Sequence, residues 1–176
     1  MKGTDLLKKE HQVILRGLKI LDTLCTALEK KQKVPLIHLE QITNFMTVYA
    51  NHYHHGKEAN ILLHYIDTKE IMEEHLLQTG YVEAMGQALA ESTDAIPSPK
   101  FMIQARNLIG LLNEHILKED NFFLPDADQS FTGEQQEELC KKLITSETEN
   151  DKKQIEKLCN IIDQLEKIYV LPQPSC

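Results

Sequence analysis

The chain has 176 residues and a formal net charge of −8 at pH 7, with only seven glycines, six prolines and no tryptophan. This length suits one domain with a sizeable core, and the many Leu, Ile, Glu, Lys and Gln residues favour helices over sheet. Basic residues are scattered among acidic ones, so no positive stripe is available for nucleic acid or an anionic membrane. The N-terminus is polar, and no apolar run approaches the roughly 20 residues of a membrane span. We therefore expect an all-α, cytoplasmic protein with neither nucleic acid nor membrane as a partner.

Apolar residues recur at spacings of three and four along four segments, which is the period of an amphipathic helix. Val34-Pro35 separates the first segment from the second, and Asp67 with Glu70 forms a capping box before the third. Ser98-Pro99 opens the fourth, which Pro125 is expected to stop. The four expected helices cover about residues 5–31, 36–66, 68–90 and 99–124, the first with Thr4 or Asp5 as its N-cap.

A further helical segment follows these four. It opens at Thr132-Gly133, and its apolar stripe of Leu158, Ile162 and Leu165 needs cover, so we expect it to fold back over the other helices. The polar run 146–153 is expected to bend or split it. Short loops join antiparallel neighbours. We therefore predict a single domain, 1–176: an up-down-up-down four-helix bundle over about residues 4–125 with an additional C-terminal helical segment over about 132–170.

Two of the expected helices carry the pattern His-x-x-x-Glu, as His54 with Glu58 and as His115 with Glu119. On an α-helix a spacing of four brings the imidazole and the carboxylate to the same face, one turn apart. Each pair therefore offers a metal ion one nitrogen and one oxygen ligand. The ferritin-like di-iron bundles use Glu-x-x-His, with the carboxylate first. The reversed order here indicates a different kind of bundle.

His11 and His75 lie on the apolar faces of the first and third expected helices, where a polar side chain needs a partner. Counting residues from each loop places both histidines at the depth of the two motifs, with a mismatch of at most about 5 Å, or one turn. Four histidines and two carboxylates in one apolar layer would be costly without cations. Imidazole with carboxylate, and no thiolate, suits iron, manganese or zinc better than copper(I) or calcium. The two carboxylates could bridge two metals.

These motifs and their surroundings resemble the bacterial hemerythrin-like domain, the cation-binding family with His-His-Glu motifs. The resemblance is carried by KEHQVIL, FMTVYANHYHHGKEANILL, EEHLLQTG and HILKEDNFFLP, and it spans about residues 4–130. It implies a non-haem di-iron centre inside a four-helix bundle, bridged by carboxylates, that binds dioxygen or nitric oxide. Carried over by position, it implies bridging roles for Glu58 and Glu119 and terminal ligand roles for His11, His54, His75 and His115.

The chain departs from the oxygen-carrying hemerythrins that it resembles. Thr79 stands where those proteins have a second histidine on the third helix, and Glu119 replaces a more distant aspartate, which weighs against a carrier role. His55 joins the predicted metal ligands because some family members use the position beside the first histidine. Its side chain projects about 100° from that of His54, which leaves a packing role open. The remaining histidines are expected to be ordinary surface or packing residues: His38, His52 and His64.

Counting ligands predicts an incomplete site. If each of two metals takes about six ligands, then two bridging carboxylates, a bridging solvent and four or five histidines leave two positions or one open. We therefore predict a di-iron protein that binds or senses dioxygen, nitric oxide or iron itself. No distinct proton donor or substrate pocket is recognisable, so a di-iron enzyme (an oxidase, a peroxidase or a catalyst that handles nitric oxide or repairs iron centres) ranks second. A structural metal bundle whose last helix recruits a protein partner ranks third.

Overall fold

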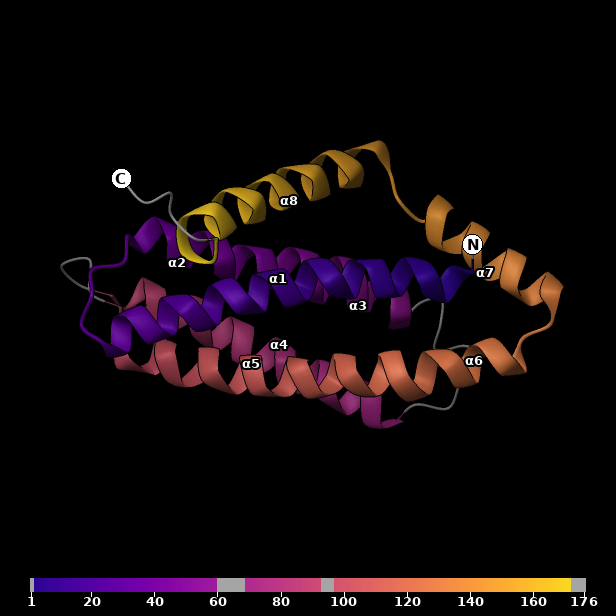
Figure 1. The fold of residues 1–176 in the computed structure, drawn as a ribbon, viewed down its shortest axis with the longest axis horizontal. Helices are drawn as coiled ribbons and strands as arrows, with labels where there is room; N and C mark the ends of the chain where they lie inside the picture. Colours follow the sequence, from indigo (N-terminus) through magenta and orange to yellow (C-terminus); the bar gives the residue numbers. More distant parts are fainter. Residues whose placement is uncertain (1, 60–68, 93–96, 172–176) are drawn as a thin grey trace.

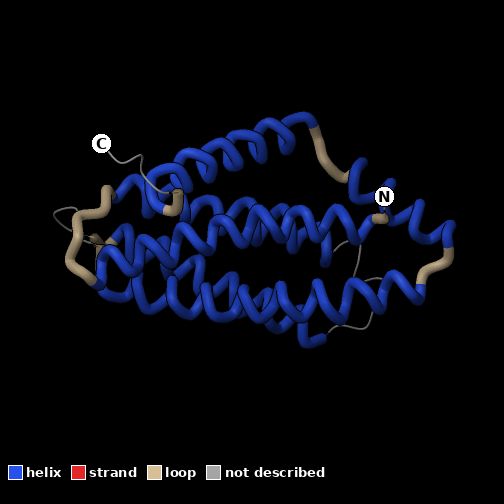
Figure 2. The backbone as a smooth tube through the Cα atoms, in the orientation of Figure 1, coloured by secondary structure: helices blue, strands red, loops and turns tan. Residues whose placement is uncertain are grey.

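The structure is a computed structural model that describes residues 2–59, 69–92 and 97–171, and within these ranges all regular structure is helical. Four rods lie side by side and successive rods run in opposite directions, which confirms the predicted four-helix bundle (Figures 1 and 2). No described helix combines the length and apolar character that crossing a membrane requires. The rods are α1 (Gly3–Glu29); α2 (Leu36–Phe45) with η1 (Met46–His54) and α3 (His55–Lys57); α4 (Lys69–Ala90); and α5 (Pro99–Lys118) with η3 (Glu119–Phe123) and α6 (Leu124–Ser130).

The first helix begins earlier than predicted. Its N-cap is Lys2, and Asp5 acts from the third helical position, where its carboxylate accepts a hydrogen bond from the backbone N–H of Lys2 at 2.8 Å. Thr4 lies inside the helix and not at its cap, and its hydroxyl donates to Asp128 at 2.7 Å. The inward face of α1 follows the predicted pattern, since Leu7, Ile14, Leu18 and Leu21 are all buried.

The second rod is not one regular α-helix. After α2 the backbone is π-helical through η1, and the N–H of His55 donates to the carbonyl of Ala50, five residues back. A π-helical turn holds one residue more than an α-helical turn, and such turns occur frequently at functional sites. This one ends at His54, the first residue of the His54–Glu58 motif. The expected end of this helix at residue 66 and the expected cap at Asp67 lie outside the described residues.

Pro125 does not stop the fourth helix as predicted, because η3 and α6 carry the rod on to Ser130. Proline cannot donate a backbone hydrogen bond and its ring crowds the carbonyl four residues earlier. The π-helical turn of η3 changes this pairing, since the N–H of Leu124 donates to the carbonyl of Glu119, five residues back. Pro125 then falls in the first turn of α6, a position where a helix tolerates proline.

The C-terminal segment is split in two and folds back over the bundle, as expected. Thr132 caps α7 (Gly133–Thr145) and Thr148 caps α8 (Glu149–Tyr169), each within a capping box. Along α8, which lies over α1 and α2 (Figure 1), the predicted stripe of Leu158, Ile162 and Leu165 enters the main core.

Ion pairs and a second apolar cluster fasten the segment at both ends. Arg16 on α1 reaches carboxylate oxygens of Asp163 and Glu166 on α8, both at 2.6 Å. Near the N-terminus a smaller buried cluster joins α7 to the bundle, and it consists of Leu7, Leu124, Leu139 and Leu143. The bundle and its extension therefore share buried surface along most of α1.

Candidate metal centre

Two groups of buried side chains lie next to each other inside the bundle. Within each group the nitrogen and oxygen atoms that could bind a metal all lie within 4.8 Å of one another. Glu58 belongs to both groups. All seven residues predicted from the sequence fall in these groups, and each is at most 7% exposed. The His11 group comprises His11, His54, Glu58 and Glu119, and the His75 group comprises His55, Glu58, His75 and His115.

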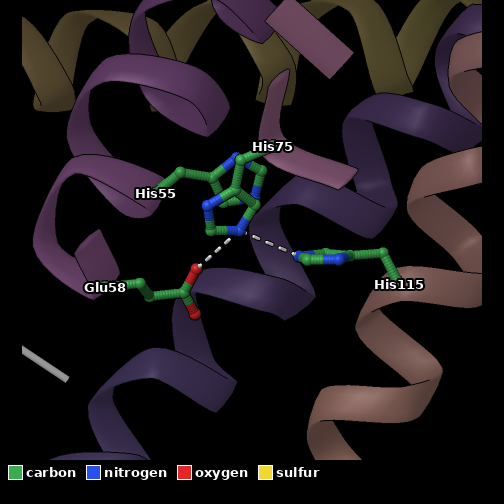
Figure 3. Close-up of side chains that lie close together, drawn as sticks. All are labelled: His55, Glu58, His75 and His115. Carbon is green, nitrogen blue, oxygen red and sulfur yellow. Dashed lines mark hydrogen bonds and ion pairs between the residues drawn. The ribbon is translucent and has the colours of Figure 1, made fainter. Parts of the chain in front are cut away.

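The carboxylate of Glu58 turns one oxygen to each group. Its Oε1 lies 3.3 Å from Nε2 of His54 and 3.8 Å from Nε2 of His11. Its Oε2 points towards Nε2 of His75 (Figure 3). These two atoms lie 3.4 Å apart. The spacing of four within the His54–Glu58 motif therefore does bring both side chains to one face, as the sequence predicts.

Glu119 is placed in the same way on the opposite side. Its Oε2 lies 3.1 Å from Nε2 of His11, and its Oε1 lies 3.4 Å from Nε2 of His115. This carboxylate, like that of Glu58, spans the space between the two groups. Two carboxylates from different helices thus each offer one oxygen to either side.

His55 faces the interior of the bundle and belongs to the His75 group. Its ring stacks on that of His75 (Figure 3). The two centroids are 3.8 Å apart and the ring planes 10° apart. Neither ring nitrogen of His55 has a hydrogen-bond partner, although the residue is only 3% exposed. His54 and His55 are neighbours in the chain, but His54 belongs to the His11 group and His55 to the His75 group. The turn that begins with them therefore supplies a histidine to each side of Glu58.

The buried polar atoms of this layer lack the hydrogen bonds that such atoms normally make. An unsatisfied buried polar group costs several kcal/mol, which makes so many in one place exceptional. A cation bound by each group would satisfy these atoms, and the nitrogen and oxygen donors suit one chemically. The unpartnered atoms are Nε2 of His11, Nε2 of His54, both ring nitrogens of His55, both carboxylate oxygens of Glu58 and Oε2 of Glu119.

The charges in this layer are strongly coupled. Burial alone would lower the pKa of His11, but its hydrogen bond with Asp120 and the nearby carboxylates of Glu119 and Glu58 raise that pKa to about 11. Burial would raise the pKa of Glu58, whereas the neighbouring histidines hold that pKa well below its usual range. Burial lowers the pKa of His55 well below its usual range. Without a metal, the anionic carboxylates therefore keep a proton on His11, and a bound cation would replace that charge.

A second layer of carboxylates supports three of the histidines from behind. Each accepts a hydrogen bond from Nδ1, which leaves Nε2 directed into the layer, the usual arrangement behind a metal-binding histidine. Sequence reasoning missed these residues, although each one is the chain neighbour of a predicted ligand. The pairs are His11 with Asp120 at 2.7 Å, His54 with Glu10 at 2.8 Å and His115 with Glu74 at 2.7 Å.

Two lysines and a glutamine were also missed. Lys57 donates to Glu10 at 2.6 Å, and Lys118 donates to Glu74, so both supporting carboxylates are held in place. Gln78 is fully buried on α4 and neither atom of its side-chain amide has a partner. The sequence could have indicated Gln78 by its position, because this residue continues the buried face of α4 between His75 and Val82.

The other histidines lie away from these groups. His52 is exposed on the second rod. His38 makes a hydrogen bond of 2.5 Å with the hydroxyl of Tyr169 and so fastens α2 to α8. His64 lies outside the described residues. The structure therefore gives His52 and His38 the ordinary surface and packing roles expected of them.

Comparison with known proteins identifies a family that covers most of the chain. A model of the family described as the hemerythrin HHE cation binding domain matches residues 2–127. Neither the curated proteins nor the solved structures contain a significant match to the chain. The matched range includes every residue of the two groups and stops within α6, before α7 and α8. The chain therefore belongs to the hemerythrin HHE cation-binding domain family.

Proposed function

We propose that the two groups hold two iron ions and that the pair binds a small diatomic ligand, dioxygen or nitric oxide. The observation that carries this proposal is the placement of Glu58 and Glu119, each with one oxygen toward either group. A carboxylate in this position can join two cations. Imidazole and carboxylate without thiolate suit iron, with zinc or manganese as weaker alternatives. Bound ferrous ions would supply a redox-active coordination position for the diatomic ligand.

The two groups differ in the number of imidazoles that they offer. The His75 group contributes three and the His11 group contributes two, while Glu58 belongs to both groups and Oε1 of Glu119 also lies 3.4 Å from His115. We therefore infer that the His11 side is the less completely coordinated of the two. His55 is responsible for this asymmetry, because it adds the third imidazole to the His75 group from the residue directly after His54.

The interior next to this layer is apolar. Ile14 lies three residues after His11 on α1, and Leu112 lies three residues before His115 on α5. Both are at most 1% exposed, and they belong to the main core. Helix residues three apart are surface neighbours, so these side chains border the layer on one side. Such a lining excludes bulk water and favours small uncharged molecules over charged ones.

Gln78 supports a ligand role for this space. It lies three residues after His75 on the inward face of α4, and its amide is fully buried with no partner for either its N–H or its carbonyl group. Leaving such a group unpaired costs about 1–3 kcal/mol, so a ligand that accepts a hydrogen bond from it would be stabilised. We propose that the Gln78 amide donates a hydrogen bond to the bound diatomic ligand.

The experiment is anaerobic loading with ferrous iron, followed by metal analysis and absorption spectra under argon, air and nitric oxide. We expect two irons per chain and a visible band that appears with the diatomic ligand and is reversed when it is removed. Zinc as the resident metal, or a spectrum unaffected by dioxygen and nitric oxide, would refute the proposal. Turnover of peroxide or nitric oxide would instead favour the enzyme alternative.

The variant Gln78→Leu tests whether the Gln78 amide donates a hydrogen bond to the diatomic ligand. It is expected to keep the iron content of the parent protein while dissociation of nitric oxide becomes about 3–10-fold faster, because one hydrogen bond contributes about 1 kcal/mol. Gln87→Leu is the matched control, since Gln87 is exposed on the same helix. Equal dissociation rates in the two variants would mean that internal water satisfies Gln78.

A further inference from the structure

A chain of hydrogen bonds leads from the His11 group to the C-terminal helical segment. Glu10 accepts from Nδ1 of His54 at 2.8 Å through one oxygen and from Nζ of Lys57 at 2.6 Å through the other. Lys57 also donates to Oε1 of Glu147 at 2.7 Å, and the hydroxyl of Tyr53 donates to the same oxygen at 2.7 Å. Glu147 lies in the short connection between α7 and α8. The predicted ligand His54 is thus connected to that junction through only two intervening side chains.

This connection differs from an exposed salt bridge. The side chains of Lys57, Glu10 and Glu147 are 8%, 12% and 20% exposed, and the Lys57 ammonium also lies 3.7 Å from the centre of the Tyr53 ring. A buried cation must be compensated by nearby anions, and removal of one leaves it poorly solvated. Lys57 therefore depends on Glu147 as well as on Glu10, and the position of Lys57 in turn constrains Glu10.

Glu147 comes from a part of the chain that the family match does not include, since the match ends at residue 127. The second layer behind the His11 group is therefore completed by this chain's own extension. We propose that Glu147 is a positioning residue for the His11 group, through which the α7–α8 junction sets how tightly that group holds its cation. The inference rests on the proposed function, because it assumes that the group binds a metal.

The ion pair between Lys57 and Glu147 lies near the surface, where it can open without unfolding the bundle. A surface cavity of about 340 Å³ lies between the second rod and the α7–α8 junction, and Tyr53, Lys57 and Glu147 form part of its wall. Solvent can therefore reach Lys57 if Glu147 moves away, while the core positions of α8 stay packed. Linkage requires the effect to be mutual: if the junction strengthens cation binding, the cation strengthens attachment of the junction to the same extent.

The first test is Glu147→Gln, which removes the charge and keeps the shape. Changing a residue bonded directly to a metal-binding histidine costs about 10–100-fold in metal affinity, and Glu147 acts through two further side chains, so we expect a loss of about 3–10-fold. The loss should affect one of two ferrous ions, measured by competition with a chromophoric chelator. Glu147→Asp keeps the charge and should recover part of the affinity.

Two control variants separate positioning from general loosening. Glu149→Gln makes the same charge change two residues away, where the side chain is 81% exposed and pairs only with Lys152 among the described ion pairs. Glu166→Gln weakens the ion pairing of Arg16 that joins α1 to α8, and Glu166 does not pair with Lys57. Both should bind both ions as the parent does. An equal loss in Glu166→Gln, or a loss shared by both ions in Glu147→Gln, would overturn the proposal.

Hydrogen exchange tests the reciprocal effect without relying on affinity. Amides of residues 146–149 in the parent should exchange about 3–10-fold more slowly with iron bound than without it, in proportion to the affinity difference. In Glu147→Gln this difference should disappear. Unchanged exchange on loading of the parent would contradict the coupling even if iron binds. A parent protein that binds no iron would instead refute the proposed function itself.

Discussion

Glu58→Gln is expected to empty both groups, because the carboxylate is the element that they share. The substitution keeps the shape of the side chain but removes its charge and replaces one oxygen by an NH₂ group, while the parent offers Oε1 to His54 and His11 and Oε2 to His75. Removing a residue that merely supports a ligand costs about 10–100-fold in affinity. Loss of the ligand itself should cost at least about 100-fold, or ~2.7 kcal/mol, for each ion.

The iron content of Glu58→Gln is compared with that of His75→Gln, because His75 belongs to one group only. After anaerobic loading with ferrous iron and desalting, the ratio of iron to protein should be two for the parent, about one for His75→Gln and close to zero for Glu58→Gln. His52→Gln should match the parent, since His52 is exposed and lies in neither group. Full occupancy in Glu58→Gln, or iron loss in His52→Gln, would refute the shared-carboxylate arrangement.

Three further outcomes are expected. His55→Ala should lose one iron and keep the other, because His55 offers a ring nitrogen to the His75 group and neither of its nitrogens has a hydrogen-bond partner; metal analysis showing two ions would contradict this. Cation loading at pH 7 should release about one proton from His11, whose pKa of about 11 keeps it protonated without metal. Calorimetry in buffers with different protonation enthalpies measures this, and a buffer-independent heat would argue against it. Ile162→Ala should destabilise the metal-free protein by about 2–5 kcal/mol in urea unfolding, because the side chain is fully buried, whereas Ile103→Ala, at a side chain 59% exposed, should change stability by less than ~0.5 kcal/mol. Equal effects of the two changes would mean that α8 does not complete the core.

Local rules explain why the helices and the motif pairs can be predicted. The period of apolar residues and the spacing of four between His54 and Glu58 depend only on the geometry of one helix. Capping boxes are equally local, and Thr132 caps α7 where the sequence places the start of that helix. The end of a helix is harder to predict from a proline, since Pro125 is tolerated when a π-helical turn comes before it. That turn depends on how the rod packs, which a proline by itself does not reveal.

The residue pattern indicates the all-helical class and the approximate depth of the histidines, and the seven side chains selected from the sequence lie together in the structure. Their distribution follows from the fold: Glu58 and Glu119 each face both groups, and His55 stacks on His75. The fold also sets which carboxylate supports which histidine, as when Glu10 bonds to His54 rather than to a neighbour on its own helix. A helix fixes the direction of each side chain relative to its own axis. The partner that a side chain meets depends on the rotation and axial shift of the facing helix, which are set by packing of the whole core.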